Sequence, residues 1–321
     1  MTRTVLAAAL FAFVSLAAHA QSYPNRAVRM IVPFAPGGTT DGLGRVLAVY
    51  LGERLGQQVV VENRPGGGGT LGAEAGARAT PDGYTVLLGS AEAFGMTDAI
   101  RKRLSYSPER DLVPVTMMAR SPNVFIVHPS LQVEKLADLV QYAKRNPGKI
   151  RYGSPGIGSN PHLIGEVFAH RLGIQMTHVP YKGGGAGIAD VVSGQIEMLI
   201  TGVVTAASRV KAGQVKPIVI TGSARTPLMP EVPTMAQAGV ADFVLGALFG
   251  IFVPNGTPAG VIERLQRELP AVSQNPDYRK RIIDIGQEVV EPLQGEAFGR
   301  VIQQEAARWR ELAAMAGVKD E

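Results

Sequence analysis

The chain contains no cysteine and only one tryptophan among its 321 residues. The lack of cysteine excludes a disulfide framework, a cysteine nucleophile and attachment of a lipid through a cysteine. Clefts for sugars and cages for quaternary ammonium ions usually present several aromatic faces, whereas the single tryptophan, Trp309, lies near the C-terminus. These absences argue against a sugar receptor and favour a small polar acid as the ligand.

The chain also lacks a large excess of charge of either sign. Lysine and arginine number 32 against 27 aspartate and glutamate residues, and the small excess is spread along the chain. The densest basic pieces, residues 101–103 and 279–281, are each three residues long. A nucleic-acid surface needs a longer basic stripe with interleaved aromatic residues, so both pieces are interpreted as solvated helix faces and no nucleic-acid partner is expected.

Long apolar runs are missing after the first twenty residues. Arg3 precedes an apolar stretch of about 14 residues, which is too short to cross a bilayer comfortably. Ala18-His19-Ala20 then matches the small-x-small pattern of a signal-peptidase site. Residues 1–20 are therefore predicted to be a signal peptide, and the mature chain is predicted to be periplasmic.

The most informative feature that is present is the segment VRMIVPFAPGGTTD, residues 28–41. An apolar, β-branched run is followed by Pro36, Gly37 and Gly38, and a helix-period stretch begins after Asp41. A strand, a glycine turn and a helix N-terminus form an anion site, because free N–H groups and the positive end of the helix dipole point at the ligand. No lysine or histidine lies in the turn, so it is interpreted as holding an anion rather than reacting with it.

Apolar runs alternate with helix-period segments, which favours an α/β fold with mainly parallel sheets. The pattern changes after residue 222, where proline-rich linkers surround one long apolar strand and two helices follow. These last elements do not form a lobe of their own and are therefore assigned to the first lobe. The predicted division is therefore lobe 1 at residues 21–121 plus 223–321 and lobe 2 at residues 122–222, with two crossovers and a cleft between the lobes. Strands are expected at residues 28–34, 58–62, 84–89, 124–128, 150–152, 177–180, 197–201, 215–221 and 243–253. Helices are expected at residues 41–55, 136–145, 259–272 and 296–315, and also after the turns at residues 65–69, 153–159 and 183–185.

Four turns that carry glycine or serine are expected at the C-terminal ends of these strands, the edge at which ligands bind in open α/β sheets. One such turn by itself is more often only a tight connection. Four of them, two in each lobe, indicate one site if the lobes face each other. The turns are residues 36–41, 89–91, 153–159 and 182–185.

Two residues in these turns allow two interpretations each. Ser159 precedes a helix with Pro161 in its first turn, so its hydroxyl is a candidate N-cap or a candidate ligand contact. Asp41 is either the cap of its own helix or a carboxylate that receives an ammonium group of the ligand.

Catalytic motifs are incomplete. The segment Gly153-Ser154-Pro155-Gly156 fails the G-x-S-x-G pattern, because Tyr152 stands where the first glycine is required. No Walker A sequence and no dinucleotide fingerprint occurs, so no cofactor is predicted. A hydrolase using Ser154 or Ser159 lacks a matched base and acid, and the chain is predicted not to be an enzyme.

One constellation suggests a metal at first sight. His162, Glu166 and His170 lie at i, i+4 and i+8 on one helix face. At a rise of about 1.5 Å per residue the three side chains spread over about 12 Å, which is too far for one ion. Glu166 is therefore interpreted as structural and His162 as a residue at the pocket edge, and no metal site is predicted.

Five ordered motifs together resemble the Bug family, the periplasmic solute-binding proteins of the tripartite tricarboxylate transporter type. The resemblance covers essentially the whole mature chain and departs at residues 247–250, where many members carry a tryptophan. The motifs are YPNR with VRMIVPFAPGGTTD (residues 23–41), VENRPG (61–66), YGSPGIGSNPHLIGEVF (152–168), HVPYKGGG (178–185) and EVPTMAQAG (231–239).

The resemblance implies a type II periplasmic-binding-protein fold that captures a small organic acid for membrane permease subunits. The acids implied are di- or tricarboxylates, aromatic carboxylates, acidic amino acids and nicotinate-like compounds, and the receptor is expected to be a monomer. A sensor that presents its ligand to a membrane kinase is the alternative, which the sequence does not separate from transport. The site residues carried over by this resemblance are Gly37, Gly38, Thr39, Asp41, Ser90, Gly158, Ser159, His162, Tyr181 and Thr201.

Overall fold

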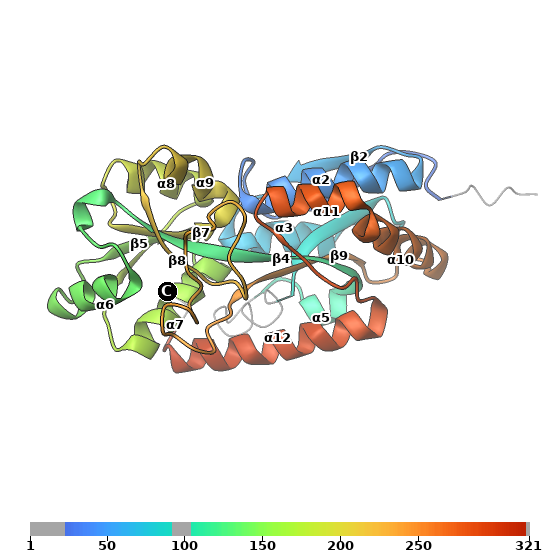
Figure 1. Ribbon diagram of the computed structural model, residues 1–321. Helices are drawn as coiled ribbons and strands as arrows, with labels where there is room; N and C mark the ends of the chain where they lie inside the picture. Colours follow the sequence, from blue (N-terminus) through green and yellow to red (C-terminus); the bar gives the residue numbers. More distant parts are fainter. Residues whose placement is uncertain (1–22, 92–103, 319–321) are drawn as a thin grey trace, which may run out of the picture.

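The computed structural model of the chain describes residues 23–91 and 104–318 (Figure 1). The predicted signal peptide and the basic piece at residues 101–103 lie outside the described residues. Within the described residues, no helix combines the length and the apolar character that crossing a membrane requires.

Strands and helices alternate through most of the described chain. The strands are β1 (Val28–Val32), β2 (Val59–Asn63), β3 (Thr85–Ser90), β4 (Leu112–Val127), β5 (Arg151–Ser154), β6 (Thr177–Pro180), β7 (Met198–Gly202), β8 (Lys216–Ile220), β9 (Gly246–Pro254) and β10 (Glu288–Val289). The helices are α2 (Thr39–Leu55), α3 (Thr70–Ala77), α5 (Pro108–Asp111), α6 (Leu136–Arg145), α7 (Asn160–Leu172), α8 (Gly184–Val192), α9 (Val203–Lys211), α10 (Ala259–Gln274), α11 (Pro276–Asp284) and α12 (Gly295–Met315), with 3-10 turns η1 (Gly67–Gly69) and η2 (Pro129–Leu131).

The strands form one mixed sheet of ten, in the order β2-β1-β3-β9-β4-β7-β5-β6, with β8 and β10 paired to β4. Strands β1, β2 and β3 run parallel, and so do β5, β6 and β7. The expectation of mainly parallel pairing is correct for these two sets but wrong for the centre. There β4 and β9 run antiparallel to each other and to their neighbours, because they carry the chain between the two sets in opposite directions.

We call the part built on β1, β2, β3 and β9 the first lobe and the part built on β5, β6, β7 and β8 the second lobe. In Figure 1 the first lobe lies on the right and the second on the left, and β4 runs through both. The 16-residue β4 pairs with β9 in the first lobe and with β7 and β8 in the second. The division at residues 122 and 222 stays a prediction.

Helix α12 lies along the underside of both lobes (Figure 1). Phe298 and Ile302 in its first half pack with the first-lobe core. Trp309 and Ala313 in its second half pack with the core of the second lobe, where Trp309 is fully buried. The helix assigned from sequence to the first lobe thus contributes apolar side chains to both lobes.

Helix α2 shows how the sequence determines the local structure beside the cleft. Leu43, Leu47, Leu51 and Leu55 recur every four residues and are all buried against the sheet. The helix ends where Gly56 adopts a left-handed conformation, which glycine adopts without steric cost. The apolar stripe therefore fixes the orientation of the helix and holds its N-terminus at the strand-end edge.

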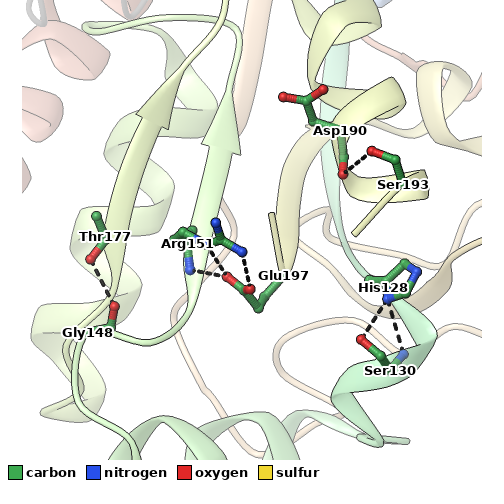
Figure 2. Close-up of polar contacts among 8 residues, drawn as sticks. All are labelled: His128, Ser130, Gly148, Arg151, Thr177, Asp190, Ser193 and Glu197. Carbon is green, nitrogen blue, oxygen red and sulfur yellow. Dashed lines mark hydrogen bonds and ion pairs between the residues drawn. The ribbon is translucent and has the colours of Figure 1, made fainter. Parts of the chain in front are cut away.

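In the second lobe, an ion pair joins the first residue of β5, Arg151, to Glu197, which directly precedes β7 (Figure 2). The backbone N–H, Nε and Nη2 of Arg151 all donate to the carboxylate of Glu197, over 2.6–2.9 Å. Burial alone would raise the pKa of Glu197, but the hydrogen bonds from Arg151 outweigh it and lower the pKa. The pair fixes the relative position of two strands whose opposite ends carry cleft turns.

Candidate functional site

A cavity of about 320 Å³ lies between the two lobes. All four turns that the sequence predicts to meet contribute to its wall. From the first lobe come Phe34, Ala35, Pro36, Gly38, Thr39, Thr40, Gly68, Ser90, Ala247 and Phe249; from the crossover in β4 come Ser121 and Asn123; from the second lobe come Pro155, Gly158, Ser159, Asn160, Pro161, Lys182, Gly183, Gly184, Gly185, Ala186, Thr201, Gly202 and Thr205.

Four helices point their N-termini at this cavity. The residues that precede the first helical residue are Gly38 for α2, Ser159 for α7, Gly183 for α8 and Gly202 for α9, and all four line the wall. None of them makes a side-chain capping hydrogen bond. The first N–H groups of each helix therefore remain available, and the four dipoles create a positive potential that suits an anion.

Two buried donors at the N-terminus of α7, on Ser159 and Asn160, complete this arrangement. Ser159 is 2% exposed and Asn160 is 7% exposed. The Oδ1 atom of Asn160 accepts a hydrogen bond of 2.7 Å from Nδ2 of Asn123. The Asn160 Nδ2 and Ser159 Oγ atoms find no partner within the described part of the chain. A buried donor without a partner is costly, so both atoms are poised for a ligand that accepts hydrogen bonds.

The cavity wall carries a single ionisable side chain. Among the described residues that line it, only Lys182 is charged, and no aspartate or glutamate lies in the wall. Lys182 is exposed and forms no ion pair that the described residues show. The described wall therefore carries a positive charge, and its other polar side chains are neutral.

The two lobes touch each other across the cleft. The hydroxyl groups of Thr39 on α2 and Thr205 on α9 lie 3.2 Å apart, within hydrogen-bonding distance. A Cβ atom at Gly68 would lie 2.3 Å from the carbonyl oxygen of Ile157, and one at Gly202 would lie 1.9 Å from the Thr39 hydroxyl oxygen. Glycine at these two positions is what allows the lobes to approach so closely.

Comparison with known proteins identifies the family. The model of the tripartite tricarboxylate transporter family receptor matches residues 43–318. The chain belongs to this receptor family. It is 34% identical to the protein BugT of Bordetella pertussis over 99% of both chains, which confirms the resemblance to the Bug proteins.

Two solved structures of relatives show the same fold with a ligand. The structure of Rpa4515 of R. palustris with adipate has a TM-score of 0.87 at 33% identity, covering 92% of this chain and 98% of that one. The structure of MatC from Rhodopseudomonas palustris with bound malate has a TM-score of 0.83 at 31% identity, covering 90% and 99%. The two-lobed periplasmic-binding-protein fold predicted from the sequence is thereby confirmed.

The structure of this tripartite tricarboxylate transporter receptor separates the predicted site residues into two groups. Gly38, Thr39, Ser90, Gly158, Ser159 and Thr201 line the cavity, whereas Gly37, Asp41, His162 and Tyr181 do not. Contact between any of them and a ligand stays a prediction. The Ser159 hydroxyl makes no capping hydrogen bond to α7, so the cap interpretation is wrong, and its contact with a ligand stays a prediction.

Asp41 is engaged in the protein itself. Its Oδ2 atom accepts hydrogen bonds from the Gly37 N–H at 3.0 Å and from Nε of Arg45 at 2.9 Å, and its Oδ1 accepts one from Asn63 at 3.0 Å. Burial alone would raise the pKa of Asp41, but these hydrogen bonds outweigh it and lower the pKa. The carboxylate holds the turn and the start of α2, and both of its oxygens are occupied.

His162 lies behind the loop rather than at its cavity face. Its Nδ1 atom accepts a hydrogen bond of 3.2 Å from the Gly158 N–H, and its ring stacks on that of His178 at 4.1 Å. Tyr152 donates to the carboxylate of Glu166, which fits the structural role expected for that residue. Within the described residues, no group of three or more potential ligands is placed to hold a metal ion.

The structure places the imidazole of His178 beside Ser154, a pairing that the sequence analysis did not predict. Oγ of Ser154 lies 2.7 Å from Nε2 of His178. Ser154 is fully buried, is absent from the cavity wall and shares its hydroxyl with both backbone groups of Gly156. The pair therefore braces the loop of residues 153–159, and the hydrolase alternative gains no support.

Several wall residues were not among the predicted ones. Asn160, Asn123 and Thr205 provide polar groups, and Phe34 and Phe249 provide aromatic faces. Asn160 directly follows the predicted Ser159, so its position at a helix N-terminus could have identified it as a residue of the cavity wall. Asn123 and Phe249 lie on strands whose pairing is visible only in the folded sheet.

From the two stacked histidines, His162 and His178, we expect the stability of the folded protein to decrease in acid. Burial lowers the pKa of His162 from 6.5 to about 4, and burial together with the neighbouring His162 lowers the pKa of His178 to about 3. Between pH 6.5 and 4 the unfolded chain binds protons that the folded protein does not. The free energy of unfolding therefore decreases as the pH is lowered through this range. His162 alone contributes about 3 kcal/mol of this loss between pH 7 and 4.

Urea unfolding at pH 7 and pH 4 measures this loss. His162→Gln is expected to flatten the dependence by most of that amount, whereas the exposed His170→Gln should leave it unchanged. Equal pH dependence in His162→Gln and the unaltered protein would contradict the assignment.

Proposed function

We propose that this protein is a periplasmic receptor that captures a small organic carboxylate and delivers it to membrane permease subunits. The observation that carries the proposal is the convergence of four uncapped helix N-termini on one cavity that also holds the unpartnered donors of Ser159 and Asn160. Donors fixed in this way form strong charge-assisted hydrogen bonds with a carboxylate. The relatives with adipate and malate support the same class of ligand.

Export and assembly belong to the same proposal. Residues 1–20 act as the signal peptide, so the mature chain begins at Gln21 and works in the periplasm as a monomer. The lobes close on the bound acid, and the closed form is the one that the permease subunits recognise. The contacts between Thr39 and Thr205 and between Gly68 and Ile157 support a closed form in which the ligand is enclosed.

Thermal unfolding with a panel of organic acids tests the proposal. A ligand present at 100 times its Kd should stabilise the folded protein by about 2.7 kcal/mol. For a chain of this size we expect a rise in Tm of roughly 4 °C. The ester in which every carboxylate of the same acid is methylated is the control, because it carries no negative charge and should have little effect.

The proposal fails if no acid of a broad panel raises the Tm of protein shown by native mass spectrometry to be folded and free of ligand. The panel should include di- and tricarboxylates, aromatic carboxylates and amino acids. Isothermal titration calorimetry of every acid that shifts the Tm then provides the affinities.

A further inference from the structure

A short segment of the first lobe reaches the second lobe beside the cleft. Residues 285–288 run from the end of α11 into β10, and β10 pairs with β4 at Ala119 and Arg120, in the first-lobe part of that strand. On the other side, a Cβ atom at Gly286 would lie 3.0 Å from Cγ1 of Val203, the first residue of α9. The segment therefore forms a contact between the two lobes.

Glu288 places a carboxylate in this contact. A Cβ atom at Gly222 would lie 2.6 Å from Oε1 of Glu288 and 3.0 Å from Cβ of Pro122. Gly222 comes just after β8 of the second lobe, and Pro122 pairs with Gly246 where β4 passes from one lobe to the other. The carboxylate of Glu288 therefore lies at the hinge, against the backbone of the second lobe, in a space that the missing side chain of Gly222 leaves free.

This carboxylate is buried and incompletely paired. Oε1 of Glu288 and Oε1 of the adjacent Gln287 are buried atoms without a hydrogen-bond partner within the described part of the chain. Burial raises the pKa of Glu288 above its ordinary value of 4.5, although the charge of Arg120 and the N–H of Ser223 act in the opposite direction. A buried carboxylate oxygen without a donor is costly, so the contact between the lobes is less stable while Glu288 is ionised.

Few charged groups of the neighbouring elements face this carboxylate. On α11, Asp284 is exposed and pairs with Lys280 at 2.6 Å. Beyond the crossover, Arg225 is exposed and donates to backbone carbonyl groups of its own loop. The first turn of α9 carries no charged side chain. Among the described residues, Arg120 on β4 is therefore the one charge that acts on Glu288.

We propose that Glu288 is a positioning residue of the hinge, whose ionised carboxylate opposes closure of the lobes until it takes up a proton. The proposal rests on the proposed function, because it requires lobes that separate to admit an acid and close around it. When the lobes separate, the segment that contains Gly222 moves away and water reaches Oε1 of Glu288. The open form therefore tolerates the charge better than the closed form does.

The direction of the effect follows from the linkage between proton binding and closure. A carboxyl group that binds its proton more tightly in the closed form favours that form as the pH falls through the raised pKa. A difference of one pKa unit between the two forms changes the closing equilibrium about tenfold. We therefore expect Glu288 to weaken ligand binding near neutral pH and to lose this effect in acid.

The isosteric variant Glu288→Gln tests the proposal by calorimetry at pH 7 and pH 5. The probes are adipate, malate and every other acid of the thermal panel that raises the Tm. At pH 7 the variant should bind at least about threefold more tightly than the unaltered protein, and at pH 5 the two affinities should converge. The titration of the probe itself affects both proteins equally and cancels in their ratio. A general loss of structure would weaken binding at both pH values.

The matched control is Glu291→Gln, which removes the same charge from an exposed side chain beyond β10. This variant should bind like the unaltered protein at both pH values.

Pulsed electron paramagnetic resonance tests the hinge without a ligand. Because the chain has no cysteine, Val49→Cys on α2 and Ala189→Cys on α8 would carry the only two spin labels, one on each lobe and both at exposed positions. From pH 7 to pH 5 the population with the shorter distance between the labels should grow at least about threefold. The same labels in Glu288→Gln should give a distribution that does not change with pH.

The outcomes separate this role from the proposed function. Equal affinities of Glu288→Gln and the unaltered protein at both pH values overturn the role of Glu288 and leave a carboxylate receptor. If no acid binds, the proposed function fails and the label distances decide. A pH-dependent distribution that Glu288→Gln lacks then supports the role of Glu288, and identical distributions in the two proteins overturn it.

Discussion

Replacing Asn160 by aspartate is expected to weaken carboxylate binding at least about 1000-fold at pH 7. The change exchanges the unpartnered Nδ2 donor for an oxygen and keeps the Oδ1 atom that accepts the hydrogen bond from Asn123. Size and shape are preserved, but the free energy of unfolding should fall, because the new carboxylate is buried with one hydrogen-bond donor. The new carboxylate would face the ligand in a site shielded from water, where like charges cost several kcal/mol, and each 1.4 kcal/mol is about tenfold in affinity.

Calorimetry with an acid that stabilises the unaltered protein measures this effect. The matched control is Asn255→Asp, which introduces the same charge at an exposed position after β9 and should change the affinity less than about twofold. If Asn160→Asp retains the affinity within about tenfold while its circular dichroism is unchanged, Asn160 does not face the carboxylate.

The second large effect is expected from Gly68→Ala. A Cβ at this position would lie 2.3 Å from the carbonyl oxygen of Ile157 and 3.1 Å from the Ser159 nitrogen, both of them backbone atoms of the other lobe. Backbone atoms cannot rotate out of the way, so the lobes must stay apart. A ligand that is enclosed by both lobes should then lose about 100-fold or more in affinity, since the contacts of one lobe are lost.

The control for this variant must carry the same backbone strain without the clash. Gly68 has a φ of +62°, and Gly173, at the C-terminal end of α7, has a φ of +60° with no atom within 4 Å of an added Cβ. Both alanine variants should lose about 1 kcal/mol of stability from the left-handed conformation, but only Gly68→Ala should lose affinity. Equal affinity in the two variants would show that the contact with Ile157 is not needed for binding.

Parts of the fold with strong local signals are predictable from the sequence. The apolar run of β1, the glycine turn after it and the stripe of leucines in α2 are read from one short segment, and the structure follows it closely. Helix α6 and strand β6 agree with the expectation residue for residue. Here local propensity and burial favour the same structure.

Helices with few buried residues were missed. Only Val203 and Ala206 of α9 are buried, and only Tyr278 and Ile282 of α11, so neither sequence shows a full apolar stripe. These helices are stabilised by what they pack against, and this is set by the tertiary structure rather than by a periodic pattern.

Strand β4 was underestimated for a different reason. Pro114 and Pro122 interrupt the strand pattern in the sequence, since proline has no N–H for the ladder. In the sheet, the register shifts between Pro114 and Thr116, and Pro122 pairs with Gly246 where β4 passes from one lobe to the other. The irregular places of the strand therefore accommodate both prolines.

The turns of the candidate site were predictable from the sequence, but the contacts between its side chains were not. Glycine turns and helix starts are visible in the sequence, and they locate the anion-binding N–H groups. The contact between Asn123 and Asn160 joins residues 37 positions apart on β4 and α7. The pairing of Ser154 with His178 depends likewise on the register of β5 and β6. Such contacts follow from the packing of elements, which no local pattern encodes.

The shared strand β4 and the bridging helix α12 have a consequence for any attempt to divide this protein. A fragment with one lobe and the whole of β4 would leave part of that strand unpaired and would remove apolar partners of one end of α12. Open strand edges of this kind invite aggregation. We therefore expect the gene to tolerate insertions in surface loops but not truncation between the lobes, and heat to melt both lobes in one cooperative transition, so that neither half is a transferable module.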